Sequence, residues 1–232
     1  MTKTILISGA TAGFGAATAR RFIAAGWRVI GTGRRADRLD ALKAELGERF
    51  HGATFDITDE AAMAAALAAL PADFAKIDVL LNNAGLALGT KPAPQTKLSD
   101  WKTMIGTNIT GLVTLTHHLL PGLIERRGAI VNIVADMWGS MPGMGHSGAA
   151  RAGMVSFTET AALEWARSGV RVNAVAPGYI ASSGMDQYPP EAGALLRDMQ
   201  ATVPLGRFGN EAETSAAIAF LLSPAAAFIS GS

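Results

Sequence analysis

Short apolar segments that alternate with longer helical segments are the feature that most limits what this chain can fold into. The apolar segments are too short for buried helices, and they end at glycine or at a polar residue, which is typical of parallel strands covered on both faces. Helical segments follow them, such as the one that stops at Gly26. We therefore expect strands at residues 4–8, 28–32, 53–55, 78–81, 129–134 and 170–176.

This alternation predicts an α/β fold, a Rossmann-like doubly wound parallel sheet of six to seven strands with helices on both faces. The chain has 232 residues, of which 49% are hydrophobic, and this suits one domain over residues 1–232. Helices are expected at residues 16–25, 35–46, 59–70, 98–126 (interrupted near Gly111), 148–167, 191–202 and 211–222.

Charge and composition argue against several classes of function. The net charge is +1 without a long basic run, so we expect no nucleic-acid partner. The chain has no cysteine, and we expect no metal site. The first apolar run is too short for a signal peptide or a membrane span. We therefore expect a cytoplasmic protein with no membrane partner.

A glycine-rich segment, Gly-Ala-Thr-Ala-Gly-Phe-Gly at residues 9–15, lies between the first predicted strand and the first helix. Glycine permits a tight turn and lets the backbone approach a phosphate, because no Cβ intervenes. The N-terminus of the helix adds free N–H groups and a partial positive charge. Although glycines also make ordinary turns, this placement predicts a dinucleotide site that includes Gly9, Thr11, Gly13, Phe14 and Gly15.

The second predicted strand is followed by Arg34 and Arg35. In dinucleotide-binding folds this strand end meets the adenosine ribose, where an acidic residue would bind the 2′-hydroxyl. Two arginines instead match the geometry and charge of a 2′-phosphate. The sequence therefore predicts NADP(H) as the cofactor, although a solvated helix start with incidental arginines is the alternative.

Further motifs follow the later strands. Together with the glycine spacing they resemble the short-chain dehydrogenase/reductase family, through Asp56, Asn82-Asn83-Ala84-Gly85, Asn108 and Pro177-Gly178. The Asn-Asn-Ala-Gly element is highly specific with this glycine spacing, and the resemblance covers nearly the whole chain. It implies that Asp56 contacts adenine, that Pro177 and Gly178 brace the nicotinamide, and that the adenine ribose is lined by Asn83, Ala84 and Gly85.

The catalytic pattern of the family is altered in this chain. The resemblance implies Asn, Ser, Tyr and Lys, with the Tyr four residues before the Lys so that both face one side of a helix. Asn108 matches the asparagine, but Ala135 stands at the serine position, Ser147 at the tyrosine position and Arg151 at the lysine position. Ser147 is a poor proton donor, and Arg151 stays charged at neutral pH. Both are retained as candidates to polarise the substrate oxygen or to hold the ribose.

Three other residues could replace the missing groups. Histidine is the side chain most often used for proton transfer near neutral pH, so His146 is the stronger candidate for the proton, although it could simply cap the helix. Asp136 and Tyr179 are weaker candidates, because a solvated loop carboxylate and a packing ring explain them equally well.

The two parts of the chain resemble different branches of the family. Residues up to about 132 resemble the serine and 3-hydroxy acid dehydrogenases, and the segment from His146 resembles the peroxisomal 2-enoyl-CoA reductases. The resemblance also implies a small substrate lid near residues 181–202 and a final strand that this chain apparently lacks. Without that strand, an edge of the sheet is expected to be uncovered.

Two functions remain open from the sequence. One is an NADP(H)-dependent oxidoreductase that transfers hydride between nicotinamide and a carbonyl, alcohol or enoyl compound. The alternative is an NADP(H)-binding protein with little or no turnover, either a sensor or an inactive scaffold. Partners are expected to be a small-molecule substrate and further copies of the chain, in a tetramer or dimer built on the two long helices.

Overall fold

One parallel sheet forms the centre of the computed structural model, which describes residues 2–136, 141–182 and 193–232. Its strand order is β3-β2-β1-β4-β5-β6. The strands are β1 (Thr4–Ile7), β2 (Arg28–Gly33), β3 (Phe50–Thr54), β4 (Val79–Asn82), β5 (Ala129–Ile133) and β6 (Arg171–Val175). The order reverses direction after β1, so the sheet is doubly wound, as the alternation predicted.

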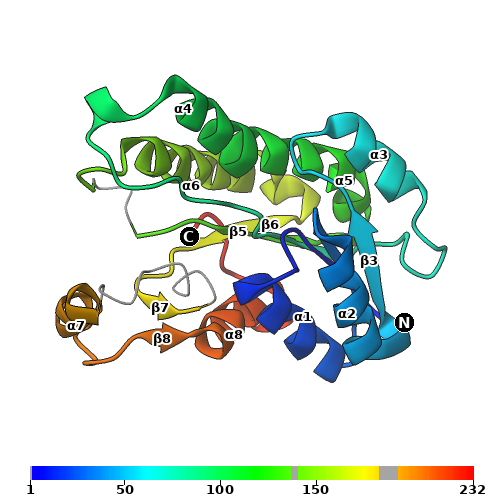
Figure 1. Cartoon of the computed structure of the whole chain (residues 1–232). Coiled ribbons are helices and arrows are strands. Elements are labelled where there is room, and N and C mark those ends of the chain that lie inside the picture. Colours follow the sequence, from blue (N-terminus) through cyan, green and yellow to red (C-terminus); the bar gives the residue numbers. More distant parts are fainter. Residues whose placement is uncertain (1, 137–140, 183–192) are drawn as a thin grey trace.

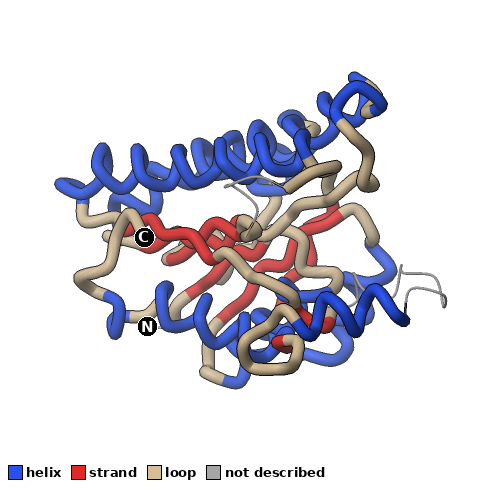
Figure 2. Tube along the Cα trace, turned by 90° about the vertical axis from the view of Figure 1, so that its left-hand side faces the viewer, coloured by secondary structure: helices blue, strands red, loops and turns tan. Residues whose placement is uncertain are grey.

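Helices cover both faces of this sheet, and Figure 2 shows the strands between two helical layers. On one face lie α1 (Gly13–Ala24), α2 (Ala36–Leu46) and α8 (Glu211–Leu222). On the other lie α3 (Glu60–Ala68), α4 (Leu98–Ile105), α5 (Leu112–Arg126) and α6 (Gly145–Trp165). The remaining elements are α7 (Gly193–Ala201), the short pair β7 (Ile180–Ala181) and β8 (Gly209–Asn210), and the 3₁₀ turns Gly47–Arg49, Ala93–Gln95, Ala166–Ser168 and Pro224–Ala226.

The alternation of side chains along each strand builds two cores. In β1, Ile5 and Ile7 join the core under α1 and α8, whereas Leu6 joins the core under α5 and α6. All three side chains are fully buried. Because both faces are covered, the strands carry apolar residues at almost every position, and this is why they appear as continuous apolar runs in the sequence.

The third strand was predicted too late and too short. It was expected at residues 53–55, but β3 begins at Phe50 and pairs with β2 from Val29 onward. Since β3 is the edge strand of the sheet, His51 and Gly52 are only partly buried. They interrupt the apolar run on which the prediction depended.

The interruption expected near Gly111 is present as a π-helical turn, Gly106–Gly111, between α4 and α5. A Cβ on Gly111 would lie 2.5 Å from the carbonyl oxygen of Ile57, so only glycine fits where this turn passes the end of β3. Single π turns in long helices often mark functional sites. This one carries Asn108, the residue that matches the family asparagine.

The end of the described chain lies beside β6. Gly231 N–H donates to the Val172 carbonyl, and the Ser232 carbonyl accepts from Ala174 N–H, both at 2.7 Å. Residues 229–232 therefore lie along the edge of the sheet that was expected to be uncovered. Of the expected lid near residues 181–202, residues 183–192 lie outside the described residues, and α7 belongs to the part that is described. Among described residues, no helix is long and apolar enough to cross a membrane.

Candidate functional site

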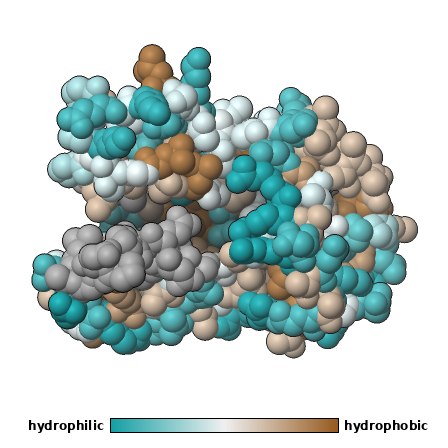
Figure 3. Space-filling view, viewed as in Figure 1, coloured by the Kyte–Doolittle hydropathy of each residue, from teal (hydrophilic) through white to brown (hydrophobic). Residues whose placement is uncertain are grey.

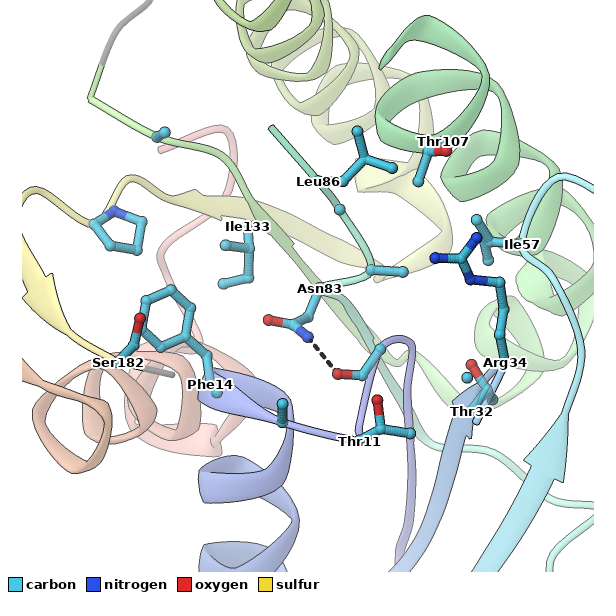
Figure 4. Close-up of a pocket in the computed structure, with 18 of the residues that line it drawn as sticks. Thr11, Phe14, Thr32, Arg34, Ile57, Asn83, Leu86, Thr107, Ile133 and Ser182 are labelled. Atoms are coloured by element: carbon cyan, nitrogen blue, oxygen red, sulfur yellow. Dashed lines mark hydrogen bonds between the residues drawn. The ribbon is translucent and has the colours of Figure 1, made fainter. Parts of the chain in front are cut away.

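A cavity of about 650 Å³ runs across the carboxyl ends of the strands. The space-filling view in Figure 3 shows the molecule hollowed on this face, and Figure 4 shows residues of the wall. The wall contains all the predicted cofactor residues except Gly15, namely Gly9, Thr11, Gly13, Phe14, Arg34, Arg35, Asp56, Asn83, Ala84, Gly85, Pro177 and Gly178. Parallel doubly wound sheets bind their ligands in this position.

The three glycines of the loop meet three different steric requirements. Gly9 and Gly13 have φ values of +69° and +57°, which side chains rarely adopt. Gly15 lies behind the wall, and a Cβ there would be 2.4 Å from the Gly9 carbonyl oxygen and 2.8 Å from Asn83 Nδ2. The turn and its close packing therefore bring the N-terminus of α1 to the cavity, where it can hold a phosphate.

Asn83 fixes the loop from the next strand. Its Nδ2 donates to the carbonyl oxygens of Ser8 and Gly9, each at 3.0 Å, and the bond to Gly9 is dashed in Figure 4. Ser8 Oγ accepts from the backbone N–H groups of Asn83 and Ala84 at 2.9 and 3.0 Å. These bonds join the loop after β1 to the end of β4, so the centre of the cavity has a rigid floor.

A buried chain of polar side chains lies beneath this floor. Asn82 Nδ2 donates to Thr116 Oγ1 and Asn132 Oδ1, and Asn132 Nδ2 donates to Thr158 Oγ1, at distances of 2.8 to 2.9 Å. All four residues are at most 1% exposed. Asn82 therefore takes the role of a buried polar residue at a strand end, and it ties β4 and β5 to α5 and α6.

One end of the cavity is basic. Arg35 Nη2 donates to Thr11 Oγ1 at 2.6 Å, and Arg34 lies 3.5 Å from Asp56 in an ion pair. Burial tends to raise the pKa of Asp56, but the hydrogen bonds from Thr58 and the charge of Arg34 outweigh it, so this pKa lies below its ordinary value. Both arginines are exposed and can reach an anion at the mouth of the cavity.

The opposite end is formed by α6 and by the ends of β5 and β6. Arg151 belongs to this wall, and its Nη1 donates to the Ile133 carbonyl at 3.0 Å. A Cβ on Gly85 would lie 3.1 Å from Arg151 Nη2, so glycine leaves room for the guanidinium. Burial lowers the pKa of Arg151 below its ordinary value, although a guanidinium remains charged at neutral pH.

Asn108 acts on the cavity through its neighbour Leu86. The buried side chain of Asn108 accepts from Leu86 N–H and donates to the Leu86 carbonyl, both at 2.9 Å. Leu86 lines the cavity and Asn108 does not. The asparagine therefore holds the segment after β4 in place.

Ser147 and His146 do not line this cavity, and each is 1% exposed. His146 Nε2 lies 2.8 Å from the Leu88 carbonyl oxygen, so the ring joins α6 to the segment after β4 instead of capping its own helix. Tyr179 is 37% exposed and packs against Phe208, and Asp136 is exposed. Of the catalytic candidates from the second half of the chain, only Arg151 reaches the wall.

Several residues of the cavity wall were not predicted from the sequence. They are mostly apolar or small residues at the ends of strands and in the turns that follow, namely Ala12, Thr32, Gly33, Phe55, Ile57, Leu86, Thr107, Ile133, Val134, Ile180 and Ser182. Their only signal is their position beside a motif residue. A search of the residues that follow each predicted strand would have found most of them.

Comparisons with known proteins agree with this geometry. A family model described as "Enoyl-(Acyl carrier protein) reductase" matches residues 9–232. Serine 3-dehydrogenase of Agrobacterium fabrum is 56% identical over 180 residues, which are 77% of this chain and 72% of that protein. The NADP-dependent 3-hydroxy acid dehydrogenase YdfG of Escherichia coli O6:H1 is 42% identical over 206 residues, 87% of this chain and 83% of its own.

A solved structure extends the agreement to the fold. The closed form of serine dehydrogenase complexed with NADP⁺ superposes with a TM-score of 0.87 at 37% identity, and covers 98% of this chain and 91% of its own. These relatives support the resemblance to the serine and 3-hydroxy acid dehydrogenases. They give no support to the separate resemblance of the segment from His146 to the 2-enoyl-CoA reductases.

Proposed function

The chain belongs to the short-chain dehydrogenase/reductase family, and from this we propose that it is an NADP(H)-dependent oxidoreductase acting on a small carbonyl or alcohol compound. The observation that carries the proposal is one cavity with a phosphate-binding loop at its centre, Arg34 and Arg35 at one end and the partly buried guanidinium of Arg151 at the other. Relatives described as NADP-dependent, and one with NADP⁺ bound, support the choice of cofactor.

The residues of the cavity fit this cofactor. The turn at Gly9 and Gly13 presents backbone and the start of α1 to a pyrophosphate. Arg34 and Arg35 stand where the 2′-phosphate of NADP(H) would lie, and Asp56, paired with Arg34, would meet the adenine. A ribose would rest on residues 83–85, and the nicotinamide would lie against Pro177 and Gly178.

A bound nicotinamide supplies or accepts the hydride. In the direction of reduction, the hydride joins the carbonyl carbon, the π electron pair moves to the oxygen, and that oxygen takes a proton. Arg151 donates hydrogen bonds to the ribose or to this oxygen and stabilises its developing charge. Since Ser147 and Arg151 cannot supply the proton at neutral pH, we assign this step to water. Asn108 positions Leu86 beside the reacting end.

The relatives indicate the class of substrate. They are described as dehydrogenases of serine and of 3-hydroxy acids, and as sulfoacetaldehyde reductases. We propose a small compound that is likewise interconverted between carbonyl and alcohol. We also propose a homo-oligomer built on the two long helices, because Leu163 of α6 and Ile124 of α5 are 81% and 38% exposed.

Turnover and binding measurements test this function. The protein is titrated with NADPH and NADH by fluorescence, and then assayed with small aldehydes, ketones, 3-oxo acids and the matching alcohols. Tight NADPH binding with turnover of one of these supports the oxidoreductase. Tight binding without turnover supports the alternative of a binding protein. This alternative is favoured by the burial of Ser147 and by the replacement of the family's catalytic Tyr and Lys with Ser147 and Arg151. Failure to bind either dinucleotide overturns both.

Substitution of Arg35 tests the choice of cofactor. Because hydrogen bonds to charged groups contribute about 1.5 to 3 kcal/mol, Arg35→Ala should weaken NADPH binding roughly ten- to a hundredfold. NADH has no 2′-phosphate, so its affinity should not change. Arg38→Ala is the matched control, since Arg38 is an exposed residue of α2, the helix that Arg35 precedes, and does not line the cavity. Equal losses for NADPH and NADH would contradict the assignment.

A further inference from the structure

Arg151 is a cation without a counter-charge in the part of the chain that the structure describes. Its one hydrogen bond there goes to a neutral acceptor, the Ile133 carbonyl, and its Nε is buried without a partner. No ion pair among the described residues includes it. A partly buried charge left in this way costs free energy unless a ligand compensates it.

The carboxylate of the cavity lies too far away to neutralise Arg151. Asp56 follows β3 and Ile133 ends β5, so four strand intervals of about 4.8 Å separate them, roughly 19 Å in all. This exceeds the screening length of about 8 to 10 Å in physiological salt. Asp56 is in addition paired with Arg34. The exposed Asp136 follows β5 by three residues, and no ion pair among the described residues joins it to Arg151.

We propose that Arg151 makes this site select the reduced form of the cofactor. The inference rests on the proposed function, which places the nicotinamide at the end of the cavity where Arg151 lies. The ring of NADP⁺ carries a positive charge, and the ring of NADPH is neutral. A fixed guanidinium charge therefore raises the free energy of bound NADP⁺ and leaves that of bound NADPH nearly unchanged.

The same charge sets the preferred direction of the reaction. Reduction begins from the favoured complex with NADPH and places negative charge on the substrate oxygen, which the guanidinium stabilises. The oxidised cofactor is then held weakly and leaves. Because arginine does not titrate near neutrality, this preference should hold across the pH range in which a lysine would begin to lose its charge.

Dissociation constants for NADPH and NADP⁺, measured on the full chain, test the proposal without reference to turnover. In the wild type we expect NADP⁺ to bind about tenfold more weakly than NADPH. This ratio follows from the Coulomb repulsion between the Arg151 guanidinium and the positively charged ring, a few ångströms apart at the edge of the protein. For a two-electron couple, tenfold corresponds to a shift of about 30 mV in the potential of the bound cofactor. Arg151→Met should abolish the difference, whereas Arg151→Lys should keep it near neutral pH.

Two controls separate charge from structural damage. Arg35→Ala should weaken both forms equally and leave their ratio unchanged, since both carry the 2′-phosphate. Asp136→Asn removes an exposed carboxylate that forms no ion pair with Arg151, so it should leave the ratio unchanged. Folding of each variant is verified by circular dichroism.

A comparison on the wild type alone avoids dependence on variants. The fragment 2′-phospho-ADP-ribose lacks the ring, so NADP⁺ should bind no more tightly than this fragment, and NADPH should bind more tightly. The proposal is overturned if NADP⁺ binds the wild type as tightly as NADPH, or if a folded Arg151→Met variant keeps the preference. Failure of all three ligands to bind would instead refute the proposed function.

Discussion

Gly15 shows how a single missing Cβ organises the cofactor half of the site. It does not line the cavity, yet its Cα packs directly against the loop at Gly9 and against Asn83, the residue that fixes that loop. An added methyl group would have to displace backbone, because the nearest atom is the Gly9 carbonyl oxygen at 2.4 Å. Because Gly15 has no Cβ, the start of α1 can lie this close to the phosphate-binding turn.

Substitution of Gly15 by alanine should consequently be destabilising. In a helix, alanine normally stabilises by about 0.5 to 1 kcal/mol relative to glycine, but overpacking costs about 1 to 3 kcal/mol. We expect Gly15→Ala to lower the free energy of unfolding in urea and to weaken NADPH binding. Gly122→Ala in α5 is the control, because its nearest neighbour is Arg126 Nη1 at 3.7 Å. Equal stability of the two variants would show that the loop can relax.

At the same scale, the cavity wall includes nearly all the residues expected to bind the cofactor, but few of those expected to be catalytic. Arg34, Arg35 and Asp56 directly follow predicted strands, and parallel strands bring such residues to one edge. His146 could not be placed in this way. Its ring contacts the carbonyl of Leu88, which lies 58 residues away in the sequence. The sequence pattern of α6 alone could not predict this contact.

At the scale of elements, the N-terminus of α8 is held by reciprocal hydrogen bonds. Asn210 Oδ1 accepts from Glu213 N–H, and Glu213 Oε2 accepts from Asn210 N–H, both at 2.9 Å. The bonds from Arg207 and from this backbone N–H lower the pKa of Glu213 from 4.5 to about 2. Because this pKa is lowered, ionised Glu213 stabilises the folded state at pH values above its ordinary pKa. This contribution is lost as the pH falls toward 2.

Glu213→Gln tests that contribution. Glutamine can keep the hydrogen bond to Asn210 but has no charge for Arg207. The wild type should therefore be more stable than the variant by a constant amount above about pH 5, and the difference should shrink between pH 4.5 and pH 2. Urea unfolding of both proteins across this range measures it. A difference that persists unchanged at the lowest pH would contradict the assignment of the pKa.

The elements also show where sequence patterns are insufficient. The bounds of α8 agree with the prediction at both ends, because its cap and its apolar run are local signals. The edge strand β3 was misplaced, because pairing with β2 decided its start and outweighed its own composition. The register of an edge strand is a property of the sheet, and no single segment encodes it.

At the scale of the whole molecule, the cavity joins distant parts of the chain. Its wall extends from Gly9 to Ser182 and draws on the ends of all six strands or the turns that follow them. A ligand that bridges the cavity should therefore stabilise the fold as a unit. Binding to the native state alone contributes about 2.7 kcal/mol at a ligand concentration one hundred times the dissociation constant.

Thermal unfolding with and without cofactor measures this coupling. For a chain of this size, each kcal/mol of stabilisation raises the unfolding midpoint by about 2 to 4 °C. NADPH at that excess should therefore raise the midpoint by roughly 5 to 10 °C. NADH at the same concentration should give a much smaller shift, since it lacks the 2′-phosphate. If the unfolding midpoint stays unchanged at every NADPH concentration tested, the cavity does not bind NADPH.

The buried polar chain beneath the cavity floor has a consequence for how relatives of this protein can diverge. Asn82, Thr116, Asn132 and Thr158 come from four different elements and are joined by buried hydrogen bonds, although Asn82 Oδ1 has no partner among the described residues. Replacing one of them by an apolar residue would leave a neighbour's group unpaired, at a cost of about 1 to 3 kcal/mol. We therefore expect these four positions to covary during evolution, whereas the exposed residues around the cavity mouth change one at a time as substrates diverge.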